Sequence, residues 1–151
     1  MTNGYSWLKL AHVLAVIVWI GGSLVLSFLT RAFIRSGNRD AAALFFREAG
    51  FYGPMIVGPS SLLVFFTGLG MAAMARVFGA RWVQIGFVGI VLHFILGAGL
   101  IRAASIRLQN ALAGPANDVA ALRSAARRLS LLNVTYLLVL LVVVAVMVLK
   151  P

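Results

Sequence analysis

The chain has 151 residues, of which 62% are hydrophobic and 11% are charged, and its formal net charge is +10. This apolar content excludes a soluble globular domain, because a soluble fold of this length cannot bury so much apolar surface. The absence of cysteine excludes disulfides, thiolate metal centres and CxxC redox chemistry. We therefore expect an all-α integral membrane four-helix bundle, with residues 1–151 forming a single transmembrane domain.

The first predicted span, residues 7–33, contains the stretch LKLAHVLAVIVWIGG. A bilayer core of about 30 Å needs roughly 20 apolar residues of helix, which this segment exceeds. We expect a retained span and not a signal peptide, since Lys9 is its only positive charge before the apolar run and no A-x-A site follows. His12 lies inside the span, and helical spacing places four residues on its face: Ala15, Trp19, Gly22 and Ser23.

An imidazole within the hydrocarbon is costly, so His12 is a candidate functional residue. The alternative is that it only forms a hydrogen bond to a neighbouring helix. The sequence leaves both interpretations open.

The next segment, SGNRDAAALFFREAG, predicts a Gly-Asn turn and then a short helix capped near Asp40. The second span, residues 51–75, has Pro54 and Pro59 near its start. A stripe along it holds Ser60, Thr67, Met71 and Met74. Two methionines at i, i+3 are candidate ligands for Cu(I), although such pairs more often pack in a core.

The third span, residues 82–103, carries His93 on a face with three glycines, Gly86, Gly89 and Gly97. These glycines admit either a close neighbouring helix or a flat ligand. A haem plane needs an axial imidazole with clearance beside it. At 1.5 Å per residue, His12 lies about 7–8 Å below Trp7, and His93 lies about 16 Å below Trp82. Two axial ligands of one iron should lie at nearly equal depth. The two histidines can therefore share an iron only if the span boundaries differ from those predicted or the helices are tilted.

The segment ALAGPANDVAALRSAARR predicts a break at Gly114-Pro115 and a new helix from Asn117 or Asp118. This helix leads into the fourth span, residues 130–149. Asn133 and Tyr136 mark one polar face of that span, and we expect the polar faces of the spans to meet inside the bundle.

The basic residues predict the orientation of the four spans. The positive-inside rule places both termini outside and the arginine-rich loops in the cytoplasm. The positive charge is thus explained by topology and not by nucleic-acid binding. Nine arginines flank the loops after the first and third spans: Arg31, Arg35, Arg39, Arg47, Arg102, Arg107, Arg123, Arg127 and Arg128. The other side has four cations: Lys9, Arg76, Arg81 and Lys150.

The stretch LKLAHVLAVIVWIGG resembles the first helix of a group of small bacterial membrane proteins. This group includes the CopD copper-resistance domain, the HemJ-type protoporphyrinogen oxidases and related uncharacterised four-helix proteins. The shared features are His12, the tryptophan seven residues later and the small residues after it. Weaker matches are FFTGL, WVQIGFVGIVLHFILG, Asn133 and the final Lys-Pro.

The resemblance implies a four-helix bundle in the bacterial inner membrane. For HemJ-type proteins it further implies haem b binding and oxidation of protoporphyrinogen IX, with His12 and His93 at the positions of the histidines. The chain departs from that type in two places, with SLVLSFLTRAF after Trp19 and NVTY in the last helix. Whether it is an oxidoreductase stays open.

Three functions follow from the residues and the resemblance. The first is a haem-binding protein with His12 as iron ligand, in which Lys9 and Arg81 pair with propionates or only snorkel to the interface. His93, Trp19 and Gly89 would complete that site. The second is a copper-handling protein that uses the histidines and methionines. The third is a cofactor-free structural subunit, and each function is compatible with a homo-oligomer in the lipid bilayer.

Overall fold

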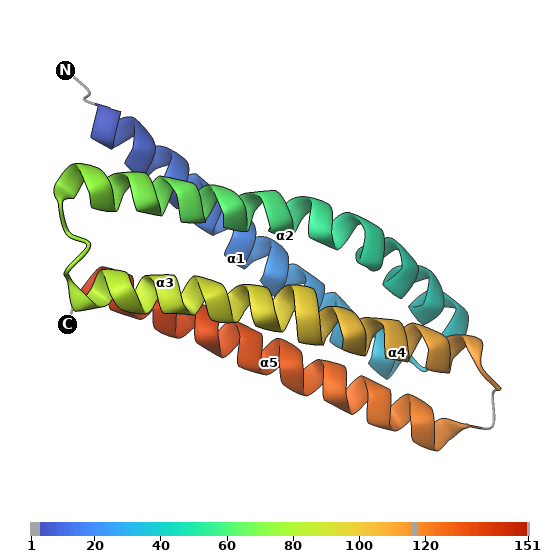
Figure 1. The fold of residues 1–151 in the computed structure, drawn as a ribbon. Helices are drawn as coiled ribbons and strands as arrows, with labels where there is room; N and C mark the ends of the chain where they lie inside the picture. The colour runs from blue at the N-terminus through green and yellow to red at the C-terminus, as the bar shows by residue number, and fades with distance from the viewer. Residues whose placement is uncertain (1–3, 116–117, 151) are drawn as a thin grey trace.

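The computed structural model describes residues 4–115 and 118–150, which are almost entirely helical (Figure 1). Within these residues four helical rods are long and apolar enough to cross a membrane, so the expected all-α membrane fold is confirmed. The third rod, Arg81–Ala113, contains a π-helical segment that the sequence did not predict. The elements are α1 Gly4–Ser36, α2 Arg39–Ala75, α3 Arg81–Phe94, the π-helix η1 Ile95–Ile101, α4 Arg102–Ala113 and α5 Val119–Leu149.

The first connection is shorter than the sequence predicted. Gly37 has a φ of +69°, and the Asn38 side chain caps α2 by accepting a 3.0 Å hydrogen bond from the backbone N–H of Ala41. A helix therefore does begin near Asp40 as predicted, but it is not short, because α2 runs unbroken to Ala75. Helical periodicity simply continues across residues 39–50 into the membrane segment.

The second helical break lies where the sequence predicted it. α4 ends at Ala113, and Gly114 is extended with φ −74° and ψ −178°. Asp118 then caps α5 by accepting a 3.0 Å hydrogen bond from the backbone N–H of Ala121. Asn117, the other predicted start, lies outside the described residues.

The helices pack as two antiparallel pairs. α1 lies along α2, and the rod α3–η1–α4 lies along α5, while α1 also contacts α5 and α2 contacts α4. One interior cluster lies in the spanning region and another near the arginine-rich end, the end of the bundle that holds the α1–α2 and α4–α5 connections (Figure 1). The first consists of Ala15, Trp19, Val64, Ile90, Tyr136 and Leu140, and the second of Ala42, Phe46, Ala104, Leu108, Leu112, Ala126 and Leu129.

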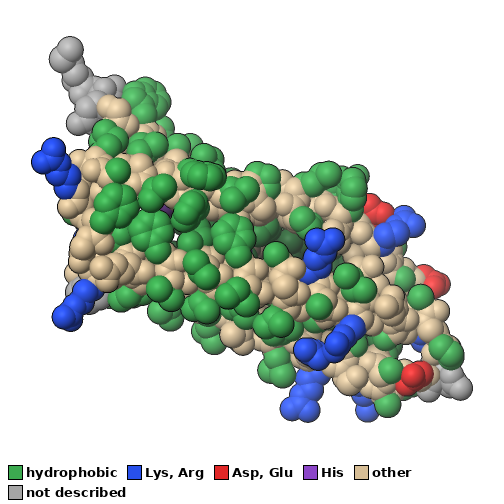
Figure 2. Space-filling view, in the orientation of Figure 1, with side chains coloured by type: hydrophobic (Ala, Val, Ile, Leu, Met, Phe, Trp, Pro, Cys, Tyr) green, Lys and Arg blue, Asp and Glu red, His purple; other side chains and the backbone are tan. Residues whose placement is uncertain are grey.

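The outer surface is apolar along the middle of the bundle. Figure 2 shows hydrophobic side chains across the visible face, with Lys and Arg towards the ends and Asp and Glu at one end only. Large side chains such as Phe28 and Phe66 are more than half exposed. A surface of this kind is stable against lipid and not against water.

Candidate functional site

His12 pairs with a hydroxyl on the neighbouring helix. Its Nδ1 lies 2.9 Å from Oγ1 of Thr67 on α2. The hydroxyl of Thr67 also donates to the backbone carbonyl of Leu63, four residues earlier. Because a hydroxyl has one hydrogen, Thr67 accepts a hydrogen bond from His12 while it donates to Leu63.

This pairing fixes the tautomer of the imidazole. In this arrangement Nδ1 of His12 carries the proton, and Nε2 is the ring nitrogen with the lone pair. The residue is only half-buried. A histidine that donates through one nitrogen and keeps a lone pair on the other has the hydrogen-bonding pattern of metal-ligating histidines.

Close packing between α1 and α2 holds the imidazole in place. A Cβ at Gly68 would lie 3.3 Å from Cε1 of His12, and one at Gly70 would lie 2.8 Å from a methyl group of Leu8. Both glycines therefore let the helices approach closely at this level. A larger side chain at Gly68 would displace the ring.

His93 lies in a different environment, which we call the midplane cluster: Trp19, Ser23, His93 and Tyr136. Its side chain is 4% exposed, with its ring 4.3 Å from that of Trp19 and 4.8 Å from that of Tyr136 between centroids. Nε2 lies 3.5 Å from the Tyr136 hydroxyl, and Nδ1 is buried with no hydrogen-bond partner among the described residues. Ser23 donates to the carbonyl of Trp19 at 2.8 Å.

The two histidines lie at different depths. His93 touches Trp19, which follows His12 by seven residues on α1. At 1.5 Å per residue, His12 is therefore about 10 Å from the midplane cluster along the helix axis. This separation agrees with the depth difference expected from the sequence and places the two imidazoles in separate sites.

The midplane cluster lies near the centre of the apolar zone. Trp82 precedes His93 by eleven residues, about 16 Å, and Arg102 follows it by nine, about 13 Å. An interfacial tryptophan and an arginine at these distances match the two faces of a hydrocarbon core about 30 Å thick.

The glycines on the face of His93 receive a neighbouring helix. A Cβ at Gly86 would overlap Met147, and one at Gly89 would overlap Val143, both on α5. The sequence allowed either a close neighbouring helix or a flat ligand beside these glycines. In the structure the neighbouring helix α5 occupies the space beside Gly86 and Gly89. In this arrangement Gly89 does not face His12.

The remaining predicted residues lie towards the end of the bundle away from the arginine-rich connections. Lys9 and Arg81 are exposed there, and Lys150 lies 5.2 Å from the centre of the Trp82 ring, a cation–π contact. Met71 is half-buried one turn beyond Thr67, while Met74 is 57% exposed. Among the described residues, no group of three His, Asp or Glu side chains is placed to hold a metal ion.

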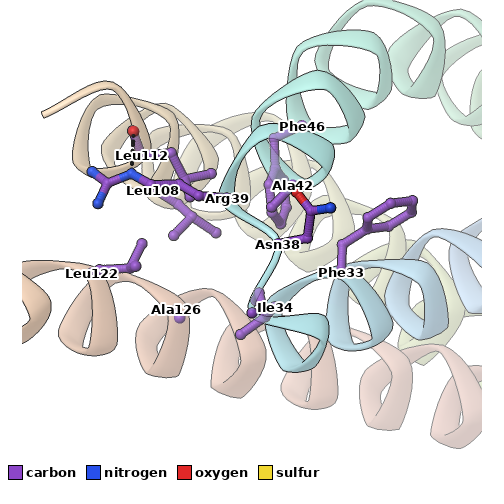
Figure 3. Close-up of a pocket in the computed structure, with 11 residues that line it drawn as sticks. Phe33, Ile34, Asn38, Arg39, Ala42, Phe46, Leu108, Leu112, Leu122 and Ala126 are labelled. Carbon is purple, nitrogen blue, oxygen red and sulfur yellow. Dashed lines mark hydrogen bonds between the residues drawn. The ribbon is translucent and has the colours of Figure 1, made fainter. Parts of the chain in front are cut away.

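An apolar pocket lies at the arginine-rich end and contains no histidine (Figure 3). Its volume is about 70 Å³, well below the roughly 300–1,000 Å³ of small-molecule sites. Arg39 lies at its edge and binds the end of α4: Nε donates to the carbonyl of Leu112 at 2.8 Å, and Nη2 to those of Ala111 and Gly114 at 2.8 and 2.7 Å. The pocket is thus a small gap in the packing where the start of α2 meets the end of α4, and Arg39 joins these two helices.

Comparison with known proteins agrees with this membrane architecture. The family described as "Predicted integral membrane protein (DUF2269)" matches residues 6–151. The chain belongs to the DUF2269 family. No curated protein and no solved structure matches it.

Sequence reasoning missed two parts of the site in this DUF2269 protein. It placed Thr67 on a polar stripe and noted FFTGL, which contains Gly68, but it paired neither residue with His12. The signal was present in the Thr67-Gly68 sequence, since a hydroxyl beside a glycine offers both a partner and space for an imidazole. In this DUF2269 protein, the pairing depends on the register of α1 against α2.

Proposed function

We propose that this membrane protein binds haem b through Nε2 of His12. One observation carries the proposal: Thr67 accepts the Nδ1 proton of His12 at 2.9 Å while its own proton goes to the Leu63 carbonyl. A histidine that ligates iron characteristically donates its second N–H to such an acceptor, which fixes ring orientation and increases ligand basicity.

The donor set favours haem over a bare metal ion. A porphyrin supplies four nitrogen ligands, so a single protein imidazole is sufficient. A bare ion needs several protein ligands close together, and the described His, Asp and Glu residues form no such group. Copper(I) would need further soft ligands besides His12. The nearest candidate along α2 is Met71, which lies one turn from Thr67 and is the residue to test for the copper alternative.

The residues of the chain have separate roles in this proposal. Thr67 orients the imidazole and Gly68 provides the space for it. Lys9, one turn from His12, and Arg81 are cations at the same end of the bundle and suit the propionates. When bound, haem would supply one-electron redox chemistry, either for electron transfer or for a porphyrin-related oxidation.

The test is an absorption spectrum of protein expressed with ample haem and purified in mild detergent. We expect a Soret band with one haem per chain, lost in His12→Ala and retained in His93→Ala. Unfolding temperature and gel filtration establish that each variant is folded. A second variant, His12→Gly with imidazole added to the buffer, should regain the band.

Three results would contradict haem binding by His12. They are a colourless protein that also fails to shift the spectrum of added haemin, a band that survives His12→Ala, and a band lost only in His93→Ala. Copper(I) binding that disappears in both His12→Ala and Met71→Leu, without a Soret band, would favour the copper alternative instead.

A further inference from the structure

Arginines from three of the four rods lie about 13–20 Å from the midplane cluster, at the arginine-rich end. Arg102 follows His93 by nine residues and Arg127 precedes Tyr136 by nine, so both lie about 13 Å from the midplane cluster. Arg31 and Arg123 lie about 18–20 Å from it by the same count. Half of a hydrocarbon core is about 15 Å, so these side chains stand where lipid phosphates begin.

Little of this charge is neutralised within the chain. Among residues 4–115 and 118–150 the structure contains one ion pair, in which Nη2 of Arg47 lies 3.0 Å from Oε1 of Glu48. The Asp118 side chain is occupied as the cap of α5. The arginines of α5 therefore have no carboxylate partner in the described structure.

Two of these arginines repel each other on one face of α5. Arg123 and Arg127 are four residues apart and both are exposed, an arrangement that is unfavourable for like charges. A phosphate between them would remove the repulsion, since each guanidinium can form a bidentate pair with phosphate oxygens.

The same face of α5 becomes apolar towards the membrane centre. Leu131 is one turn beyond Arg127 and is 59% exposed, and Leu138, two turns further, is 56% exposed. A cationic pair followed by exposed leucines along a single helix face matches the order of headgroup and acyl chain in a phospholipid. A free phosphate would use only the cationic part.

We propose that α5 holds an anionic phospholipid, with the lipid phosphate bridging Arg123 and Arg127 and an acyl chain lying over Leu131 and Leu138. Arg102 of α4 stands at the depth of Arg127 and adds positive potential. This site is independent of His12 and of haem binding.

The test measures lipid binding to the intact protein in detergent by native mass spectrometry and by unfolding temperature. The probes are phosphatidylglycerol, phosphatidylcholine with the same acyl chains, and inorganic phosphate. We expect phosphatidylglycerol to bind and to raise the unfolding temperature, with little effect of the other two. In Arg123→Gln/Arg127→Gln, the affinity for phosphatidylglycerol should fall at least about tenfold.

The matched control is Arg35→Gln/Arg107→Gln, which removes the same charge at the same end but from α1 and α4 and not from α5. It should retain most of the phosphatidylglycerol affinity. Arg123→Lys/Arg127→Lys keeps the charge and should weaken binding less than Arg123→Gln/Arg127→Gln does. Retained binding in the lysine variant also shows that this region folds when both arginines are replaced. Equal losses in both glutamine pairs would overturn the proposal, as would equal binding of the two lipids or an equal effect of inorganic phosphate.

Discussion

Nε1 of Trp19 donates a 3.0 Å hydrogen bond to the hydroxyl of Tyr136, joining residues 117 positions apart in the sequence. Both residues are 5% exposed. The bond links α1 to α5 at the centre of the apolar zone, where no water is present to replace a missing partner. His93 packs against both rings, so this contact organises the interior of the bundle.

Tyr136→Phe should destabilise the protein, because it leaves the Trp19 N–H buried without an acceptor. We expect a loss of about 1–2 kcal/mol in the free energy of unfolding. Unfolding in detergent measures this loss for Tyr136→Phe, Trp19→Phe and the double variant. The double variant should lose less than the sum of the single variants, and strict additivity would show that the bond contributes nothing.

Gly89→Ala and Gly86→Ala should differ although both glycines face α5. The Cβ at Gly89 would overlap Val143, a stiff β-branched residue, and the loss should be about 1–3 kcal/mol. The Cβ at Gly86 would meet the flexible end of Met147, which can move away at lower cost. Unfolding temperatures of the two variants provide the comparison, and an equal or larger loss for Gly86→Ala would contradict this packing.

Thr67→Val should weaken haem binding without removing it, if His12 is the ligand. The variant keeps the side-chain shape but removes the acceptor of the Nδ1 proton, and we expect the affinity to fall about 10–100-fold. Thr67→Ser keeps the hydroxyl and should bind haemin almost as well as the parent. Haemin titration followed by absorbance measures all three proteins. An unchanged affinity in Thr67→Val would remove the assigned role of the hydroxyl.

Arg39→Lys should loosen the end of α4. Lysine has one nitrogen and cannot reach the carbonyls of Ala111, Leu112 and Gly114 together as the guanidinium does. Backbone amides near the end of α4 should then exchange hydrogen at least about tenfold faster, while those near His12 stay unchanged. Arg35→Lys is the control, and equal exchange in both variants would show that Arg39 does not hold this junction.

The four rods and their inward faces could be predicted from the sequence because hydropathy and helical periodicity are local properties. On the face predicted to hold His12, Ala15, Trp19 and Ser23 are buried, while His12 and Gly22 are half-buried. The sequence predicts the second span only from residue 51, because the polar residues Arg47 and Glu48 precede the apolar run. They instead lie on a helix that extends past the membrane.

The contacts of the candidate site could not be predicted, because they depend on how two helices are placed against each other. His12 meets Thr67 across 55 residues, and that register is set by the close approach at Gly68 and Gly70. The π-helix after His93 was also unforeseen, since the stretch ILGAGLI has no local pattern that separates it from an α-helix. Haem binding, copper binding and the orientation of the bundle stay predictions.

The two prolines of α2 have a mechanical consequence. Pro54 and Pro59 each lack an N–H, so α2 loses two backbone hydrogen bonds within a short stretch, and the helix curves along its length (Figure 1). The two prolines lie between Arg39, which binds the end of α4, and Thr67, which forms the hydrogen bond with His12 towards the other end of α2. The missing hydrogen bonds make residues 50–59 the part of α2 that bends most easily. A bend at these prolines would change the direction of the residues that follow Arg39 relative to the half of α2 that carries Thr67.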